Sequence, residues 1–323
     1  MKLKNDNFAV LGRAGLDLYP EPAGTEIEHA THFMAALGGS SGNIAAGLTR
    51  LGAKVQLITR VSDDAVGRYT IAECQRYGID TGYVALQRGE QRNTLALSET
   101  RIDQPQTVIY RNNAADFMLC EDDVATVDWS ACGALIFTGT SLAVDPSRRA
   151  TMAAIEKARN AGCAVLFDID YRAYSWASLE EAAKICGEAA RQCDIVIGND
   201  DEFGVLAGGH EKGRAFAQDL ARSEASHTRI CVYKMGAEGS VTFDGDDAFE
   251  TGIFPVTAIK PTGAGDAFMA GFAYSLSKGA SLRDCVLRGS AGAAMVVTRV
   301  GCAPAMPTQT ELHDFMSAPT TTA

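Results

Sequence analysis

A single carboxylate follows a glycine-rich turn in the stretch KPTGAGDAFMAGF, residues 260–272. Gly263 and Gly265 let backbone N–H groups converge at the start of the apolar helix that follows, where exposed donors and the helix dipole stabilise an anion. Asp266 would repel a resting phosphate, but it can accept a proton from an attacking hydroxyl group. A base beside an anion-binding turn is suited to phosphoryl transfer. Taken alone, these residues also fit an aspartate that merely caps a helix.

Three other catalytic motifs fit the sequence poorly. The dinucleotide fingerprint G-x-G-x-x-G fails because Phe268 stands at its third glycine. The phosphate loop G-x-x-x-x-G-K-[ST] fails because Ala53 separates Gly52 from Lys54. GGSSG matches the hydrolase pattern G-x-S-x-G with Ser40 as nucleophile, but no histidine lies in a recognisable setting for a catalytic triad.

A second glycine-rich segment, residues 38–69, has the sequence GGSSGNIAAGLTRLGAKVQLITRVSDDAVGRY. Gly38, Gly39 and Asn43 stand at the mouth of an alanine-rich helix, where small residues let a polar ligand approach the backbone and an amide can bind its hydroxyls. Alone, this segment predicts only a tight contact between a helix and a sheet. The same spacing combined with the later GAGD is far more specific than either half.

Short apolar runs alternate with helical stretches along the chain. This pattern is typical of a mainly parallel sheet covered by helices, which would hold these residues in place. The predicted strands are residues 8–12, 54–61, 134–139, 164–170, 194–198 and 229–235. A helix is predicted over residues 145–162, with Asp145 as its cap, Pro146 in its first position and Gly162 at its end. The sequence therefore predicts an α/β fold.

Two regions lack the helices that this alternation demands. Residues 16–37 and 80–111 contain short extended runs such as TGYVALQ, NTLALSE and QTVIYR. We predict that they form a small antiparallel sheet inserted into a single domain of residues 1–323, and that this sheet covers a site as a lid. Exposed strand edges invite pairing with a second subunit, so a homodimer through the lid is one expectation, while short and charged edges would leave a monomer.

The composition restricts the classes of partner. The 323 residues are 46% hydrophobic, which allows a sizeable core, and the formal net charge of -11 opposes binding to the phosphate backbone of nucleic acids. There is no run of about 18 apolar residues to span a bilayer and no signal-peptide pattern at the start, so we expect a cytoplasmic protein without a membrane partner. The nine cysteines include no C-x-x-C pair, and we expect neither disulfides nor zinc.

From GRAGLDLYP to VGCAPAMP, the chain resembles the ribokinase-like, or PfkB, carbohydrate kinases. Within that family, the segments DLY, LITRV, FDIDYR, CDIVIG and GCAP are most similar to those of 5-dehydro-2-deoxygluconokinases. The resemblance implies a three-layer α/β sandwich with a mainly parallel central sheet and a small β-sheet lid. It also implies an ATP-dependent, Mg²⁺-requiring kinase that phosphorylates the terminal hydroxyl of 5-dehydro-2-deoxy-D-gluconate, a small sugar acid.

The resemblance further implies roles for single residues on the sugar side. Asp266 would be the catalytic base that deprotonates the sugar hydroxyl. The amides of three residues would hold the transferring γ-phosphoryl group: Gly263, Ala264 and Gly265. Four residues would bind sugar hydroxyls: Asp17, Gly38, Gly39 and Asn43.

On the nucleotide side, Asn199 and Glu202 match an N-x-x-E pattern that helps place Mg²⁺ and phosphate through water. A polar loop that opens a helix is the simpler alternative for this pair. Lys234, Gly236 and Gly239 match a turn beside the nucleotide. Lys234 also fits the solvated end of a strand.

Two arginines bear on the substrate class. Arg111 in VIYRNNAAD and Arg172 in FDIDYRAYSW lie, by likeness to kinases of acid sugars, near the far end of the substrate. A guanidinium binds a carboxylate through two parallel hydrogen bonds, so the pair favours an anionic sugar, although each arginine alone also fits an ordinary ion pair. A 2-dehydro-3-deoxygluconokinase and a neutral-sugar kinase such as a fructokinase are the alternative enzymes. A non-catalytic sugar-binding regulator on the same fold is the alternative from another class.

One position departs from the family pattern. Many members carry an aspartate six residues before the catalytic one, in a run that helps bind a monovalent cation, and Lys260 occupies that position here. We therefore hypothesise that the Lys260 ammonium replaces a potassium ion and weakens or removes activation by monovalent cations. The alternative is a Lys260 side chain that simply points to solvent.

Overall fold

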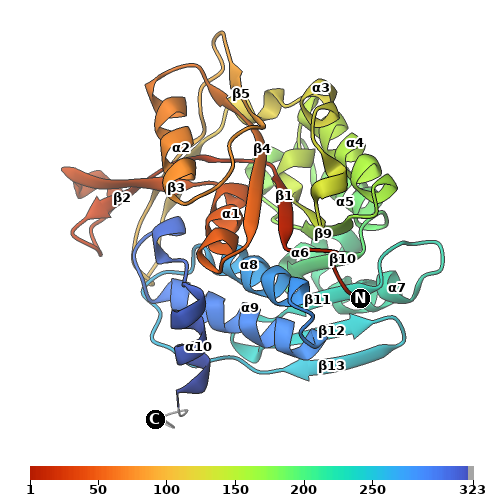
Figure 1. Ribbon diagram of the computed structural model, residues 1–323. Coiled ribbons are helices and arrows are strands. Elements are labelled where there is room, and N and C mark those ends of the chain that lie inside the picture. Colours follow the sequence, from red (N-terminus) through yellow and green to blue (C-terminus); the bar gives the residue numbers. More distant parts are fainter. Residues whose placement is uncertain (319–323) are drawn as a thin grey trace.

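The computed structural model describes residues 1–318, and its middle layer is a nine-stranded sheet (Figure 1). The strand order is β13-β12-β11-β10-β9-β8-β1-β4-β5, and neighbouring strands are parallel except along the β11-β12-β13 edge. The strands are β1 (Asn7–Leu11), β4 (Lys54–Ser62), β5 (Val84–Gln87), β8 (Ala134–Thr138), β9 (Ala164–Asp168), β10 (Ile195–Asn199), β11 (Ile230–Lys234), β12 (Ser240–Asp244) and β13 (Asp247–Thr251). All six strands predicted from the sequence are among them.

Helices cover both faces of this sheet, because successive strand side chains point to opposite faces and both sets are apolar. In β1, Phe8 and Val10 pack into one core with α1, α8 and α9, while Ala9 and Leu11 pack into a second core with α4, α5 and α7. The helices are α1 (Ser40–Arg50), α2 (Ala65–Arg76), α3 (Glu121–Ala125), α4 (Ser147–Asn160), α5 (Leu179–Ala190), α6 (Asp200–Ala207), α7 (Gly213–Arg222), α8 (Ala264–Ser277), α9 (Leu282–Val297) and α10 (Gln309–Ser317). The predicted three-layer α/β sandwich is confirmed.

The helix predicted over residues 145–162 is α4. Its first helical residue is Ser147, one residue after Pro146, which we predicted for that position. The prediction that Asp145 caps it is wrong, because Pro146 occupies the N-cap position. The Asp145 carboxylate lies instead 3.6 Å from Arg149 Nε on the helix surface. Gly162 follows the helix with a φ of 71°, the left-handed conformation that commonly ends a helix.

A second, four-stranded sheet has the order β3-β2-β6-β7. Its strands are β2 (Gly15–Glu21), β3 (His32–Gly38), β6 (Leu95–Ser98) and β7 (Thr107–Tyr110). β2 and β3 project from the body of the molecule, as Figure 1 shows. β2 pairs antiparallel with β3 but parallel with β6, so the sheet is mixed and the prediction of a purely antiparallel sheet is wrong.

The run TGYVALQ, which we predicted to join this small sheet, belongs to the central sheet. Its residues Val84–Gln87 form β5 and pair in parallel with the end of β4. Tyr83 packs against the core on one face of the sheet and Val84 against the core on the other. These contacts fix the segment as an edge strand of the main body, so only part of residues 80–111 belongs to the small sheet.

Two further observations concern membrane-spanning helices and the cysteines. Within residues 1–318, no helix combines the length and the apolar character needed to cross a membrane. All nine cysteines are free, and all except Cys120 are buried. They act as small core side chains in this fold.

Candidate active site

A cavity of about 790 Å³ opens at the carboxyl ends of the central strands. Arg13 follows β1, Asp168 ends β9 and Lys234 ends β11, and all three line the cavity. The start of α8 lines it as well, and the small sheet contributes Ala96 and Ile109. Open parallel sheets bind ligands in the crevice beyond these strand ends, so segments far apart in the sequence meet at one site.

The predicted anion-binding turn forms the start of α8. Gly263 is the N-cap residue with a φ of 85° and has no side chain to cap the helix. A Cβ on Gly263 would lie 3.0 Å from Cys302 Sγ, so both the backbone conformation and the packing favour glycine. Gly263, Ala264 and Gly265 all line the cavity. The first N–H groups of α8 are therefore available to bind an anion.

Asp266 lies in the first turn of α8 and lines the same cavity. Asn43 Nδ2 donates a hydrogen bond to Asp266 Oδ2 over 2.8 Å. Burial and the nearby Asp170 carboxylate raise the pKa of Asp266 from 3.8 to about 7. The Asn43 hydrogen bond and the charges of Arg172 and Arg13 oppose that rise. A carboxylate with a pKa near neutrality is well suited to accept a proton from a hydroxyl group.

Three of the four residues predicted to bind sugar hydroxyls line the cavity: Asp17, Gly39 and Asn43. Gly38 lies outside the lining, and a Cβ on it would lie 1.9 Å from Asp17 Oδ1. The glycine at this position therefore makes room for the Asp17 carboxylate. Gly39 has a φ of 85°, and a Cβ there would lie 2.5 Å from the carbonyl oxygen of Arg13.

Arg172 lines the cavity, and its guanidinium is paired with a carboxylate of the protein. Arg172 Nη2 lies 2.7 Å from Asp170 Oδ1, and Ser40 Oγ donates to the other oxygen of Asp170 over 2.6 Å. Asp168 is buried two residues earlier, and burial raises its pKa well above the usual value while Lys234 opposes that rise. The sequence analysis did not assign Asp168 or Asp170 to the site, although two aspartates at the end of a strand in FDIDYR were the signal. It considered Ser40 only as the nucleophile of a hydrolase and not as a partner of Asp170.

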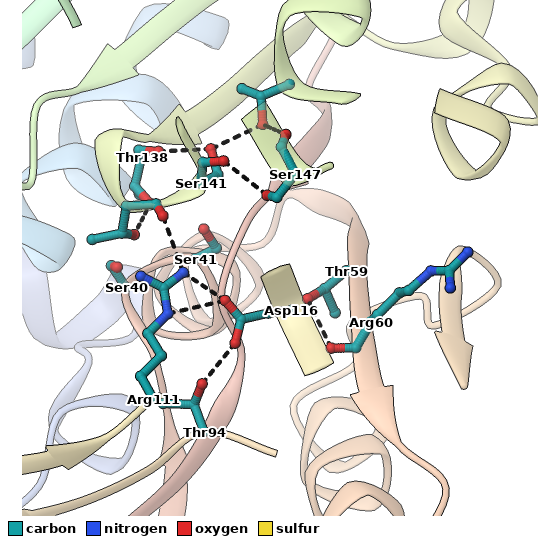
Figure 2. A network of polar contacts seen from close by, with 12 residues as sticks. Ser40, Ser41, Thr59, Arg60, Thr94, Arg111, Asp116, Thr138, Ser141 and Ser147 are labelled. Carbon is teal, nitrogen blue, oxygen red and sulfur yellow. Dashed lines mark hydrogen bonds and ion pairs between the residues drawn. The ribbon is translucent and has the colours of Figure 1, made fainter. Parts of the chain in front are cut away.

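Arg111 lies outside the cavity, in contrast to the prediction that it faces the substrate. Its guanidinium is buried and donates to Asp116 Oδ2 over 3.0 Å (Figure 2). It also donates to the carbonyl oxygen of Thr140 over 3.0 Å. Thr94 donates to the other oxygen of Asp116 over 2.6 Å. Because Thr94 precedes β6 and Arg111 follows β7, the Asp116 carboxylate holds both ends of the β6–β7 hairpin.

Asn199 and Glu202 form a capping box at the start of α6. Asn199 Oδ1 accepts from the Glu202 amide, and Glu202 Oε2 accepts from the Asn199 amide, both over 2.8 Å. The two residues thus open a helix, as the simpler alternative to a nucleotide-side role predicted. Both residues also line the cavity, so the two roles are compatible. The remaining Glu202 oxygen is therefore the one that a ligand can use.

Lys234, Gly236 and Gly239 lie where β11 turns into β12, and all three line the cavity. Lys234 Nζ lies 3.7 Å from the position that a Cβ on Gly265 would occupy, so its ammonium faces the anion-binding turn. The alternative of a solvated strand end does not describe this position. Gly236 and Gly239 have φ values of 56° and 89°, and the turn needs glycine at both.

Lys260 is fully buried, so the alternative that it points to solvent is wrong. Its Nζ donates a hydrogen bond to the carbonyl oxygen of Thr262 over 2.5 Å, directly before the anion-binding turn. Burial lowers the pKa of Lys260, while Cys302, Asp266 and Asp17 oppose that shift. The ammonium thus lies beside the anion-binding turn and in the field of two acidic residues of the site.

An apolar part of the cavity also escaped sequence analysis. Ile253 and Val256 follow β13, are 46% and 38% exposed, and line the cavity together with Ala293 and Val297 of α9. Apolar side chains that converge on a pocket are the usual surroundings of a flat, weakly polar ligand group. The signal in the sequence was the apolar run GIFPVTAI, residues 252–259, which directly follows β13.

The acidic residues of the cavity do not form a metal site by themselves. In residues 1–318, no group of three His, Cys, Asp or Glu side chains is arranged to hold a metal ion. Mg²⁺ in phosphoryl-transfer enzymes needs only one or two carboxylates, because waters and substrate phosphates complete its shell. The buried carboxylates of Asp168 and Glu202 fit that requirement, since burial of several negative charges together favours a nearby cation.

Comparison with known proteins adds sequence and structural relatives. A family model described as pfkB family carbohydrate kinase matches residues 5–309. A 5-dehydro-2-deoxygluconokinase of Photobacterium profundum is 38% identical over 312 residues, covering 95% of this chain and 93% of the relative. Another protein of that name, from Geobacillus thermodenitrificans, is 34% identical and covers 96% of this chain and 93% of the relative.

Solved structures with low sequence identity share the fold. A fructokinase double mutant from Vibrio cholerae with fructose, ADP and potassium bound superposes with a TM-score of 0.85 at 23% identity, covering 98% of this chain and 100% of that chain. An aminoimidazole riboside kinase from Salmonella enterica has a TM-score of 0.80 at 24% identity, covering 97% of this chain and 100% of that chain. With the family match over nearly the whole chain, the protein belongs to the pfkB family of carbohydrate kinases, phosphotransferases that act on a sugar hydroxyl.

Proposed function

We propose that this kinase transfers the γ-phosphoryl group of ATP to the terminal hydroxyl of 5-dehydro-2-deoxy-D-gluconate. The observation that carries the reaction type is Asp266, held by Asn43 beside the uncapped start of α8, with a pKa of about 7. The substrate is supported by relatives of that name at 38% and 34% identity. It is also supported by the arginines Arg13 and Arg172 in the cavity, because guanidinium groups bind carboxylates well.

In this reaction the chain itself would supply a base, an anion hole and a cation. Asp266 takes the proton from the sugar hydroxyl at its carboxylate, and Asn43 keeps that carboxylate oriented. The amides of Gly263, Ala264 and Gly265, with the Lys234 ammonium beside them, stabilise the negative charge of the phosphoryl group during transfer. The remaining work is positioning and exclusion of water, which suits a cavity partly walled by the small sheet.

For the nucleotide, we assign the apolar surface of Ile253, Val256 and α9 to the base and the β11–β12 turn to the phosphates. Asp168 and Glu202 would hold Mg²⁺, directly or through water, and the ion would neutralise phosphate charge. ATP as donor and nine free cysteines fit a cytoplasmic place of action. A small anionic sugar, rather than a nucleic acid or membrane, remains the partner that the site suits.

ADP release should be measured with a panel of sugar acids and neutral sugars. The highest kcat/KM is expected for 5-dehydro-2-deoxy-D-gluconate, with 2-dehydro-3-deoxygluconate and fructose far behind. A preference for fructose would contradict the substrate assignment, and a preference for 2-dehydro-3-deoxygluconate would transfer it to the other sugar acid. Sugar binding without ADP release from any member would support a non-catalytic regulator instead.

We also propose that the buried Lys260 ammonium supplies the charge that a monovalent cation would bring to the anion-binding turn. This proposal is supported by the hydrogen bond of Lys260 to the Thr262 carbonyl and by the attraction of Asp266 and Asp17 for its charge. Turnover should therefore be the same in potassium chloride and in a bulky organic chloride at equal ionic strength. Strong stimulation by potassium would contradict this role.

A homodimer through the small sheet is the assembly we propose. Residues whose side chains share one face of this sheet line the cavity, including Asp17, Ala96, Ser98 and Ile109. The register places on the opposite face an apolar set: Leu16, Leu18, Ala35, Leu95, Leu97, Val108 and Tyr110. Val108 and Tyr110 are 39% and 60% exposed, and a second copy of the same face would cover them. Sedimentation should give a dimer that Tyr110→Asp dissociates, and a wild-type monomer would contradict the proposal.

A further inference from the structure

Arg13 differs from Arg111 and Arg172 because its guanidinium has no hydrogen-bond or ion-pair partner among the described residues 1–318. It follows β1, is 7% exposed and lines the cavity. Its Nε is buried without a hydrogen bond, and the side chain forms no ion pair with any residue in the described part of the chain. Arg172 is paired with Asp170, and Arg111 is paired with Asp116. Arg13 is therefore the arginine whose donors are free for a ligand.

Acidic residues surround Arg13 without binding it. Burial raises the pKa of Asp17 and of Asp266, and the charge of Arg13 opposes that rise in both. Burial also acts to raise the pKa of Asp116, but the charges of Arg111 and Arg13 outweigh it, so the Arg13 guanidinium lies in the field of all three carboxylates. Each of these carboxylates has a different hydrogen-bond donor: Tyr19, Arg111 and Asn43. A buried charge that its own protein leaves without a hydrogen-bond partner is costly, and a bound anion removes that cost.

The place of Arg13 in the fold distinguishes between two anions, the carboxylate of a sugar acid and the phosphate of ATP. The strands β1 and β11 are four positions apart in the sheet, roughly 19 Å at about 4.8 Å per strand. Lys234 at the end of β11 already faces the anion-binding turn. Arg13 lies at the other end of this distance, at the end of β1. A Cβ on Gly39 would lie 2.5 Å from the carbonyl oxygen of Arg13, and β2 of the small sheet begins two residues after Arg13.

We infer that Arg13 is the residue that binds the carboxylate of the sugar acid and so determines specificity for an anionic substrate. The planar guanidinium accepts a carboxylate through two parallel hydrogen bonds, which a neutral sugar cannot provide. The acidic residues nearby would repel a carboxylate, so discrimination in favour of a sugar acid depends on this positive charge. The inference rests on the proposed function, because it names the group that selects the proposed substrate.

The test compares three enzymes with two substrates. Wild-type enzyme and Arg13→Gln are assayed with 5-dehydro-2-deoxy-D-gluconate and with its neutral C1 amide, and the matched control is Arg149→Gln, an exposed arginine on α4. For Arg13→Gln we expect kcat/KM for the acid to fall at least about 100-fold, mostly through KM, and kcat/KM for the amide to change less than about 5-fold. KM for ATP should stay the same, and Arg149→Gln should match the wild type.

Several outcomes would overturn the inference. A loss of less than about 5-fold for the acid, an equal loss for acid and amide, or a rise confined to KM for ATP would each exclude carboxylate binding by Arg13. If Arg13→Gln does not fold, Arg13→Lys replaces it, since an ammonium keeps the charge but not the two parallel bonds. A wild-type enzyme that prefers neutral sugars would instead refute the proposed substrate, and equal wild-type kcat/KM for acid and amide would refute the carboxylate site itself.

Discussion

Asn43 Nδ2 lies 2.8 Å from Asp266 Oδ2 and so connects the first turn of α1 to the first turn of α8. The two residues are 223 positions apart in the sequence. The amide stabilises the carboxylate form and limits the rise in the pKa of Asp266 that burial causes. The same contact therefore orients the base and sets the pH range in which it is unprotonated.

Asn43→Ala should shift the pH dependence of the reaction to higher pH. The wild-type kcat/KM is expected to fall as the pH drops through about 7, because Asp266 acts as a carboxylate and is protonated below its pKa of about 7. Removal of the amide donor raises that pKa further, so the acidic limb should move upward. A pH profile of kcat/KM measures the shift, with Thr49→Ala on the same helix as control; an unchanged limb would separate Asn43 from the titration of Asp266.

Asp266→Asn should bind ATP and lose roughly 100- to 10,000-fold in turnover, the usual cost of removing a general base. The fold should survive. Because the pKa of Asp266 is higher in the folded protein than its ordinary 3.8, the carboxylate makes folding less favourable as the pH rises from about 4 to about 7. The asparagine variant lacks this penalty, so at pH 8 its unfolding temperature should equal or exceed that of the wild type. Near-normal turnover would refute the role of Asp266.

Arg111→Met should destabilise the protein by about 3–5 kcal/mol, because it leaves the buried Asp116 carboxylate without its ion pair. Both side chains of this pair are 4% exposed, so water cannot replace the guanidinium. Urea unfolding of the variant, compared with Arg149→Gln at an exposed position, measures the difference. If Arg111 instead bound substrate, the variant would keep its stability and lose affinity for the sugar acid.

Gly38→Ala should impair the sugar site without touching the nucleotide. The added Cβ would lie 1.9 Å from Asp17 Oδ1, so the carboxylate must move. A displacement of this size costs up to about 100-fold in kcat/KM when it misplaces a substrate group. Gly252→Ala is the matched control, because a Cβ there meets nothing within 4 Å. Equal effects of the two variants on KM for the sugar would show that Asp17 does not position it.

Sequence reasoning was most reliable where the chemistry is local. The GAGD turn predicts the start of a helix, because the glycines that allow the turn and the apolar residues of the helix are consecutive in the sequence. The central strands were predictable for the same reason, since each strand buried on both faces is a continuous apolar run. The assignment of β5 failed because TGYVALQ has the pattern of any edge strand, and only its contacts with β4 decide which sheet it joins.

The arginines show why the rest of the site could not be predicted. Arg13, Arg111 and Arg172 all follow strands, and nothing in the sequence states which guanidinium already has a carboxylate partner. Asp116 forms an ion pair with Arg111, and Asp170 forms one with Arg172. Both contacts depend on how the folded backbone brings the residues together. Lys260 is similar, because a lysine flanked by Ile259 and Pro261 gives no sign that its ammonium is fully buried.

The bonds of Thr94 and Arg111 to Asp116 constrain how the β6–β7 hairpin can swing. The residues at the two ends of the hairpin bind the same carboxylate, so neither strand can slide past the other without breaking a buried hydrogen bond or ion pair. Because β6 also pairs with β2, an opening movement that keeps these bonds must tilt the hairpin about Asp116 together with β2, and Asp17, Ala96 and Ile109 would leave the cavity together.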